Sequence, residues 1–369
     1  MKDNVNKISW WRTSFGEDVV DNIVRSVRNE CISMGSVTAQ FEGQLAQALD
    51  VPYVVTTTSG SMALLMAMMA VGIKPGDEVI VPNRTWIATA HAPMLLGAKV
   101  ILVDVLADRS VMDVSQIEEK ITSKTKAIIP VALNGRAVDM DEVWKIAKKH
   151  GLHVVEDAAQ ALFCRYAGNL SSRHMGTESE MGCFSFSMAK LLPTGQGGFV
   201  ATKHKDVYDK LKRIRTHGVD DVINCTFFDM GFNFRFTDVQ SSIGQIQLER
   251  IKQRIAQIQA IYAKYELALK GIGFLKLIPV NVAAGEIPIY AEVLCKEREK
   301  LIAFLAAQGI QTRPFYPDLN TAKHLGATGR FPNAEVFGSQ GLVLPCGPDQ
   351  PLENIDRVIE CLKLFGKKD

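Results

Sequence analysis

At three places in this sequence, residues that could do chemistry follow segments that are typical of buried β-strands. These residues are Thr58-Ser59-Gly60-Ser61 after Tyr53–Thr57, Glu156–Gln160 after the strand that starts at His153, and Lys190 after Gly182–Phe186. In an open α/β sheet, ligands collect beyond the carboxyl ends of the strands. Residues at these three places are therefore the first candidates for binding and catalysis.

The segment Thr58–Ser61 has the form of an anion site. Gly60 allows an anion to approach the backbone, and the start of the following helix and the Ser61 hydroxyl supply hydrogen-bond donors. The segment could equally be a plain helix cap, because serine before a helix is common. Taken alone, the motif leaves both interpretations open.

Asp157 and Lys190 suggest a more specific chemistry. The small residues Ala158 and Ala159 allow a flat group to pack beside Asp157, although a simple carboxylate cap is the alternative. Lys190 lies among Met, Ala and Leu side chains, and desolvation there would lower its pKa and leave a neutral, nucleophilic fraction. A surface lysine in a turn fits such neighbours poorly.

The glycines that follow Lys190 do not form a dinucleotide-binding fingerprint. Gly195, Gly197 and Gly198 precede a strand, whereas the fingerprint links a strand to a helix. Taken together, an anion site, a strand-end acid and a buried lysine are what pyridoxal 5'-phosphate (PLP) requires. The acid would pair with the pyridine nitrogen, and the lysine would hold the aldehyde.

The elements that would position these residues alternate along the first two thirds of the chain. Short β-branched runs are separated by helical patterns such as Met62–Val71 and Asp141–His150, which favours an α/β fold with a mostly parallel sheet covered by helices. The predicted strands are Tyr53–Thr57, Glu78–Val81, Val100–Val103, Ala127–Pro130, His153–Glu156, Gly182–Phe186 and Phe199–Ala201.

A second, smaller α+β domain is predicted at the C-terminal end. A long amphipathic stretch from Thr237 to about Lys270 leads out of the sheet domain. Two strands and two helices follow, at Glu292–Cys295, Gln311–Arg313, Arg298–Gln308 and Leu352–Leu364. We place the large domain at residues 1–250 and the small domain at residues 251–369.

Composition argues against several functional classes. The 42 basic and 40 acidic residues leave a formal net charge of +2, which gives no electrostatic case for nucleic acid or a membrane surface. The longest apolar run, Met62–Ile73, is too short to span a bilayer, and residues 1–11 show no apolar block of a secretory signal. Seven scattered cysteines without a CxxC pair indicate free thiols and a cytoplasmic location. Neither they nor the seven histidines form a metal-ligand cluster.

Several segments, taken in order, resemble the DegT/StrS-type sugar aminotransferases of PLP fold type I. The resemblance runs from about Gly16 to Glu249 and returns weakly at Arg313–Pro317. The segments that carry it are Ser59–Ser61, Pro75–Pro82, Ser123–Pro130, Glu156–Gln160, Phe184–Phe186, Lys190 and Gly231–Arg235.

This resemblance implies a role for each matching residue. Lys190 would hold PLP as a Schiff base and later shuttle the proton, and Asp157 would pair with the ring nitrogen. Trp86 would stack on the ring, and Gln160 would contact its phenolic oxygen. The residues that would hold the phosphate are Gly60, Ser61 and Ser185, together with Asn233 or Arg235 from the other subunit of a homodimer.

The resemblance also implies the reaction, namely transfer of an amino group from an amino acid, glutamate first, to a keto sugar linked to a nucleotide. Three alternatives remain on the same fold: a PLP-dependent sugar dehydratase, a keto-cyclitol aminotransferase and a non-catalytic sugar-binding protein. The dehydratases of this family carry histidine in place of the lysine, and binding alone requires no Schiff-base lysine. Lys190 therefore favours the aminotransferase.

The sequence departs from the family pattern in three places. Pro193 and Gln196 stand where relatives commonly have Thr and Glu, and the stretch Gly168–Met175 is about four residues longer than usual. A His-containing substrate motif is not recognisable near Ile287–Tyr290. These differences concern the sugar and the position of amination more than the cofactor.

Overall fold

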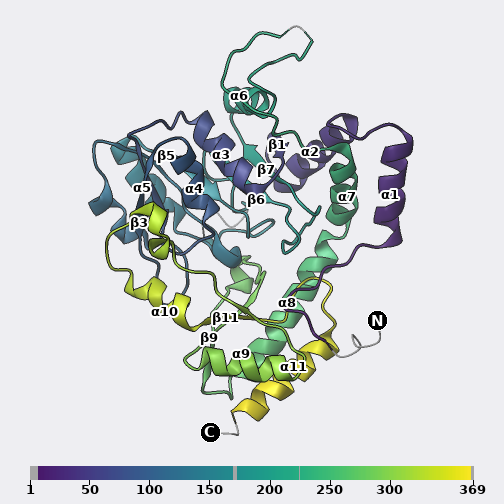
Figure 1. Cartoon of the computed structure of the whole chain (residues 1–369), viewed down its shortest axis with the longest axis vertical. Coiled ribbons are helices and arrows are strands. Elements are labelled where there is room, and N and C mark those ends of the chain that lie inside the picture. Colours follow the sequence, from purple (N-terminus) through teal and green to yellow (C-terminus); the bar gives the residue numbers. More distant parts are fainter. Residues whose placement is uncertain (1–6, 169–172, 224, 367–369) are drawn as a thin grey trace.

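The computed structural model describes residues 7–168, 173–223 and 225–366, and its centre is a seven-stranded sheet with helices on both faces (Figure 1). The strand order is β1-β7-β6-β5-β4-β2-β3, and only β7 runs antiparallel to its neighbours among these strands. The strands are β1 Tyr53–Thr57, β2 Glu78–Pro82, β3 Lys99–Val103, β4 Thr125–Ile128, β5 His153–Asp157, β6 Met181–Ser185 and β7 Gly198–Thr202.

Both faces of this sheet are buried, which explains the near-continuous apolar strands. Along β2, for example, Val79 and Val81 belong to one hydrophobic core and Ile80 belongs to the other. One core includes residues of α3 (Gly60–Ala70), α4 (Ala88–Leu95) and α6 (Lys205–Arg215); the other includes residues of α2 (Ser36–Leu49) and α5 (Met140–His150). This arrangement confirms the predicted α/β fold.

A smaller antiparallel sheet with its own helices follows the large one. Its strand order is β10-β11-β9-β8, and α8 leads from the large sheet toward it (Figure 1). The elements are α7 Asp238–Glu249, α8 Ile251–Leu269, β8 Leu275–Leu277, β9 Ala291–Cys295, α9 Arg298–Ala307, β10 Arg313–Pro314, α10 Pro332–Gln340, β11 Gly341–Leu344 and α11 Leu352–Phe365.

The amphipathic stretch that we predicted as continuous is divided at Arg250. This residue ends α7 with ψ near 0°, and its guanidinium pairs with Asp18 of α1 (Glu17–Arg28), which packs beside α7. The start of the described chain also reaches the smaller sheet, since Ile8 pairs with Ile310 and Trp11 pairs with Cys346. The domain boundary near residue 250 remains a prediction.

Two further points concern predictions from the sequence. No helix of the described ranges is both long enough and apolar enough to cross a membrane. The middle of the long stretch Gly168–Met175, residues 169–172, lies outside the residues that the structure describes.

A close approach between β6 and a neighbouring turn generates a stability prediction. A Cβ atom at Gly182 would lie 1.8 Å from the carbonyl oxygen of Gly176, a backbone atom with little freedom to move. We expect Gly182→Ala to lower the free energy of unfolding by at least about 3 kcal/mol. Gly43→Ala in α2 is the control, because nothing lies within 4 Å of its Cβ position, and it should stabilise by about 1 kcal/mol. Equal urea midpoints for the two variants would contradict this account.

Candidate active site

A cavity of about 300 Å³ lies where the carboxyl ends of the large sheet meet the smaller sheet. Its walls come from the turns after β1, β2, β5 and β6 and from residues near β9, β10 and β11. Of the nine residues singled out from the sequence, seven line this cavity: Gly60, Ser61, Trp86, Asp157, Gln160, Ser185 and Lys190.

Asp157 is a buried carboxylate at the end of β5. Its side chain accepts a hydrogen bond of 2.7 Å from the Thr89 hydroxyl and one of 3.1 Å from the backbone N–H of Ala159. Burial raises the pKa of Asp157 above its ordinary value, and these two hydrogen bonds and the charge of Lys190 only oppose that rise. A cationic partner in the cavity would therefore stabilise the carboxylate.

Burial in the same cavity shifts the pKa of Lys190 in the opposite direction to that of Asp157. The pKa of its amine is lowered to about 8, chiefly by burial; the charge of Asp157 opposes this shift, and the charge of Arg313 adds to it. A substantial fraction of the amine is therefore neutral near pH 8, whereas an exposed lysine has a pKa of about 10.4. The structure supports the prediction that apolar surroundings make this lysine a nucleophile.

The turn that carries Lys190 is held from two distant parts of the chain. The indole N–H of Trp11 donates to the carbonyl oxygen of Met188 at 3.0 Å, and the Tyr290 hydroxyl donates to that of Ala189 at 2.7 Å. Both contacts fix the backbone directly before Lys190. Sequence reasoning missed Trp11 and Tyr290, because no local pattern links residues that are 177 and 101 positions away from their partners.

The start of α3 supplies another part of the cavity wall, with hydrogen-bond donors suited to an anion. Helix α3 begins at Gly60, with Ser59 as its cap accepting the N–H of Met62 at 3.2 Å, so the helix-cap interpretation holds for Ser59. A Cβ at Gly60 would lie 2.8 Å from the Cβ of Ser185, so only glycine allows this close approach. Ser61, Ser185 and the first N–H groups of α3 thus border one end of the cavity, where a phosphate would be accepted.

Two walls of the cavity suit a flat ring. Trp86 is 49% exposed although it lines the cavity, and it meets Tyr316 edge-on with ring centroids 5.7 Å apart. Gln160 lies on the wall beside Asp157, where its side-chain oxygen accepts the N–H of Asn134 at 3.0 Å. Exposed aromatic surface inside a cavity is available for stacking on a heterocycle.

Asn233 and Arg235 lie away from this cavity. The Arg235 guanidinium donates to the Asn233 side-chain oxygen at 2.8 Å, and Asn233 is exposed. Within one chain, the two residues therefore do not contribute to the walls that carry Asp157 and Lys190. Their role toward the other subunit of a dimer remains a prediction.

These residues fit PLP on three independent observations. The glycine-bordered end would accept a phosphate, the buried acid with a raised pKa would accept a protonated ring nitrogen, and the lysine with a lowered pKa would accept an aldehyde. Thr89 was not anticipated from the sequence, because a threonine inside a helix 68 residues before Asp157 gives no signal of its own.

The chain is similar to known proteins over nearly its whole length. The sequence profile of the DegT/DnrJ/EryC1/StrS aminotransferase family matches residues 14–363. A GDP-perosamine synthase from Caulobacter vibrioides is 35% identical over 339 residues, which cover 89% of this chain and 90% of the relative. A UDP-2-acetamido-2-deoxy-3-oxo-D-glucuronate aminotransferase from Pseudomonas aeruginosa is 34% identical over 339 residues, covering 90% and 92%.

Solved structures agree with this relationship. The PLP form of Spr1654 from Streptococcus pneumoniae superposes with a TM-score of 0.91 at 25% sequence identity, covering 98% of this chain and 99% of that chain.

The lowered pKa of Lys190 can be measured directly. In protein stripped of cofactor, we expect trace labelling with acetic anhydride to modify Lys190 with a midpoint near pH 8, because burial disfavours its charged form. Exposed lysines in the same digest should titrate near pH 10.4 and serve as the internal control. A Lys190 midpoint at or above that of the surface lysines would refute the desolvated site.

Proposed function

Because this chain belongs to the DegT/DnrJ/EryC1/StrS aminotransferase family of PLP-dependent enzymes, we propose that it transfers an amino group from an amino acid to a nucleotide-linked keto sugar. Glutamate is the first donor to consider. The observation that carries the proposal is the presence of Asp157 and Lys190 on one cavity that ends in an anion site. The names of the two relatives, which refer to GDP- and UDP-linked sugars, support the class of acceptor.

Each residue of the cavity has a part in this proposal. When bound, PLP supplies an electron sink that allows an amino acid to lose its α-proton. The neutral amine of Lys190 would take that proton and would return it to the cofactor carbon that carried the aldehyde, on the far side of the nitrogen. Ser61, Ser185 and the start of α3 hold the phosphate, Trp86 covers the ring, and Gln160 contacts the ring oxygen.

Asp157 keeps the ring nitrogen protonated. An ion pair at contact contributes roughly 4 kcal/mol at an effective dielectric constant of about 20. A neutral amide in its place would contribute only about 1 kcal/mol through a hydrogen bond. Since the protonated ring is the stronger electron sink, the charge of Asp157 matters more than its shape. Thr89 and the N–H of Ala159 orient the carboxylate for this contact.

We also propose that the working unit is a homodimer in which Asn233 or Arg235 reaches the phosphate of the other subunit. The support is the segment before α7, where large apolar side chains are exposed: Ile223 (85%), Phe227 (75%), Phe228, Met230 and Phe232. This segment projects beyond α6 in Figure 1. Large exposed apolar side chains that gather on one segment are typical of a protein interface. The seven free thiols support a reaction in the cytoplasm.

The reaction is tested in two separate halves. Incubation with glutamate alone should release one equivalent of 2-oxoglutarate per site, and a nucleotide-linked keto sugar added afterwards should become an amino sugar. We expect Asp157→Asn to retain PLP but to slow the first half by about two orders of magnitude, as the loss of about 3 kcal/mol of ring protonation implies.

Lys190→Ala is the control that should bind PLP without covalent attachment and release no 2-oxoglutarate. If the unmutated protein releases no 2-oxo acid from any amino acid, the aminotransferase proposal fails. Near-normal rates for Asp157→Asn would show that another group protonates the ring.

The shared site is tested by mixing two inactive proteins. One carries Lys190→Ala, and the other carries Asn233→Ala with Arg235→Ala. In a symmetric dimer, each mixed pair holds one site with both defects and one with neither, so random exchange should restore about a quarter of the unmutated activity. Mass spectrometry of the intact dimers confirms exchange. If exchange occurs and no activity returns, each site is complete within one subunit.

A further inference from the structure

Two histidines that are 233 positions apart in the sequence meet beside the walls of the cavity. The Nε2 atoms of His91 and His324 lie 2.8 Å apart, and the centroids of the two rings are 5.0 Å apart. His91 lies on α4, three residues after Ala88 of the cavity wall, and is half-buried. His324 lies on the short helix η7 (Lys323–Leu325) and is exposed. The proposed reaction uses neither side chain, so the pair requires an explanation of its own.

We infer that His91 and His324 together bind a divalent transition-metal ion, Zn²⁺ first, through their Nε2 atoms. This inference does not depend on the proposed aminotransferase function. Imidazole nitrogen suits zinc, copper and nickel, whereas magnesium and calcium prefer oxygen ligands. The two rings therefore define the class of ion. The sequence analysis gave no metal-ligand cluster because residues so distant in the chain form no local motif.

The spacing of the two nitrogen atoms is close to what a shared metal ion requires. Zinc–nitrogen bonds of about 2.0–2.1 Å at tetrahedral angles place two ligand nitrogens about 3.3 Å apart. The observed distance of 2.8 Å is shorter than this by about 0.5 Å. Rotation of the exposed His324 side chain is enough to supply that difference. An ion could therefore enter between the rings without a change in the backbone.

The protonation state of the pair also suits a metal ion. A hydrogen bond between two Nε2 atoms requires one of them to be an acceptor, so at least one ring is neutral. Burial lowers the pKa of His91, and the neighbouring His324 lowers it further. The neutral imidazole is the form that binds a metal. A plain hydrogen bond between the two rings is the alternative, and it requires no ion.

Buried contacts fix the two elements that carry the histidines relative to each other. The backbone oxygen of Asn83 accepts the N–H of Leu319 at 2.9 Å, and the Asn83 side chain forms two hydrogen bonds with Asn320, of 2.8 and 3.0 Å. Arg84 pairs with Asp318 at 2.5 Å, and both side chains are buried. Because these contacts lie just before α4 and just before η7, the imidazoles are held on facing elements. A preorganised pair loses less conformational entropy when it binds a ligand.

Water would complete the coordination of the ion. Within residues 7–168, 173–223 and 225–366, no group of three or more His, Cys, Asp or Glu side chains is placed to hold a metal ion. Two imidazoles therefore leave positions open, and we expect an ion that exchanges with solvent, unlike the closed four-ligand sites of structural zinc. The ion would join α4 to η7 beside the cavity residues Trp86 and Tyr316, whose rings meet at 5.7 Å. It would thus stabilise the contact between these two walls.

The experiment titrates ZnCl₂ into the PLP-loaded protein, prepared without a histidine tag, and follows binding by calorimetry. We expect His91→Asn and His324→Asn each to weaken zinc binding at least about 10-fold, because even the loss of a residue that supports a metal ligand costs about 10- to 100-fold. Zinc should raise the Tm of the unmutated protein and not that of the two variants. His150→Ala is the control, since that histidine pairs with Glu118 elsewhere and should leave the site unchanged. MgCl₂ should not compete with zinc.

A cysteine variant distinguishes metal binding from a structural role of the pair. His324→Cys removes the imidazole but supplies another zinc ligand, so it should retain zinc binding that His324→Asn loses. With Co²⁺ in place of zinc, His324→Cys should show a thiolate-to-cobalt absorption band that the unmutated protein lacks. Because His324 is exposed, both variants should fold normally, and circular dichroism checks this.

Two results would overturn the inference. Equal zinc affinity in the unmutated protein and in His324→Asn would leave the pair as a hydrogen bond between neutral rings. Loss of zinc binding in His150→Ala alone would place the ion at Glu118 instead. Since every readout is a binding, stability or spectroscopic measurement, failure of the aminotransferase proposal would not affect this test.

Discussion

The active site depends on burying a carboxylate and an amine of opposite preference in one cavity. Desolvation drives Asp157 toward its neutral acid and Lys190 toward its neutral amine, while their mutual attraction opposes both changes. The site therefore favours a ligand that supplies a cation to the acid and uses the free amine as a nucleophile. A PLP ring does both, and the neighbouring strands β5 and β6 place the two residues on one edge of the sheet.

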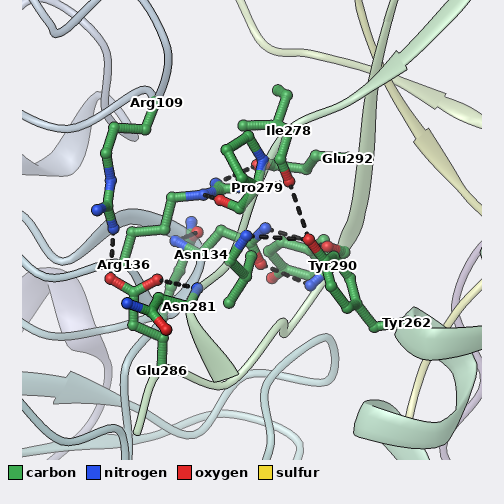
Figure 2. Close-up of polar contacts among 12 residues, drawn as sticks. Arg109, Asn134, Arg136, Tyr262, Ile278, Pro279, Asn281, Glu286, Tyr290 and Glu292 are labelled. Atoms are coloured by element: carbon green, nitrogen blue, oxygen red, sulfur yellow. Dashed lines mark hydrogen bonds and ion pairs between the residues drawn. The ribbon is translucent and has the colours of Figure 1, made fainter. Parts of the chain in front are cut away.

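The second requirement is that the two sheets close on one another around this pair. Arg136 links the large sheet to Glu292 and to the carbonyl groups of Ile278 and Pro279, and Asn134 bonds the backbone of Tyr290 (Figure 2). Breaking a buried pair such as Arg136–Glu292 costs about 3–5 kcal/mol, because one charge is left uncompensated. The Tyr290 hydroxyl in turn bonds the turn before Lys190, so contacts that join the two sheets also hold the backbone beside the lysine.

One position at which this chain departs from the family pattern, Gln196, lies on the wall of the cavity. Its carbonyl oxygen accepts the side-chain amide of Gln240 on α7 at 3.0 Å. Near the expected His-containing motif, the wall is instead formed by Tyr290 and Glu292. The cofactor side, from Gly60 to Lys190, keeps the expected residues.

The sequence by itself determined the elements and the residues next to them. Strand β1 was predicted with its observed bounds, the other six strands of the large sheet were located within three residues, and Gly60, Ser61, Asp157, Ser185 and Lys190 followed because they sit at strand ends. Such features are local: alternation of apolar residues, turn residues and short motifs act within about ten positions. The antiparallel direction of β7 and the break at Arg250 were not anticipated, because pairing partners and the Asp18 contact are distant in sequence.

Only the tertiary structure decided which side chains complete the cavity. Residues tens to hundreds of positions apart in the sequence meet there. Thr89 bonds Asp157, and Trp11 and Tyr290 bond the turn before Lys190. The cavity wall also includes Trp10 and Arg313. Hydrogen bonds and charge pairs act over a few ångströms in space, and the chain's own order does not encode which distant residues will come that close.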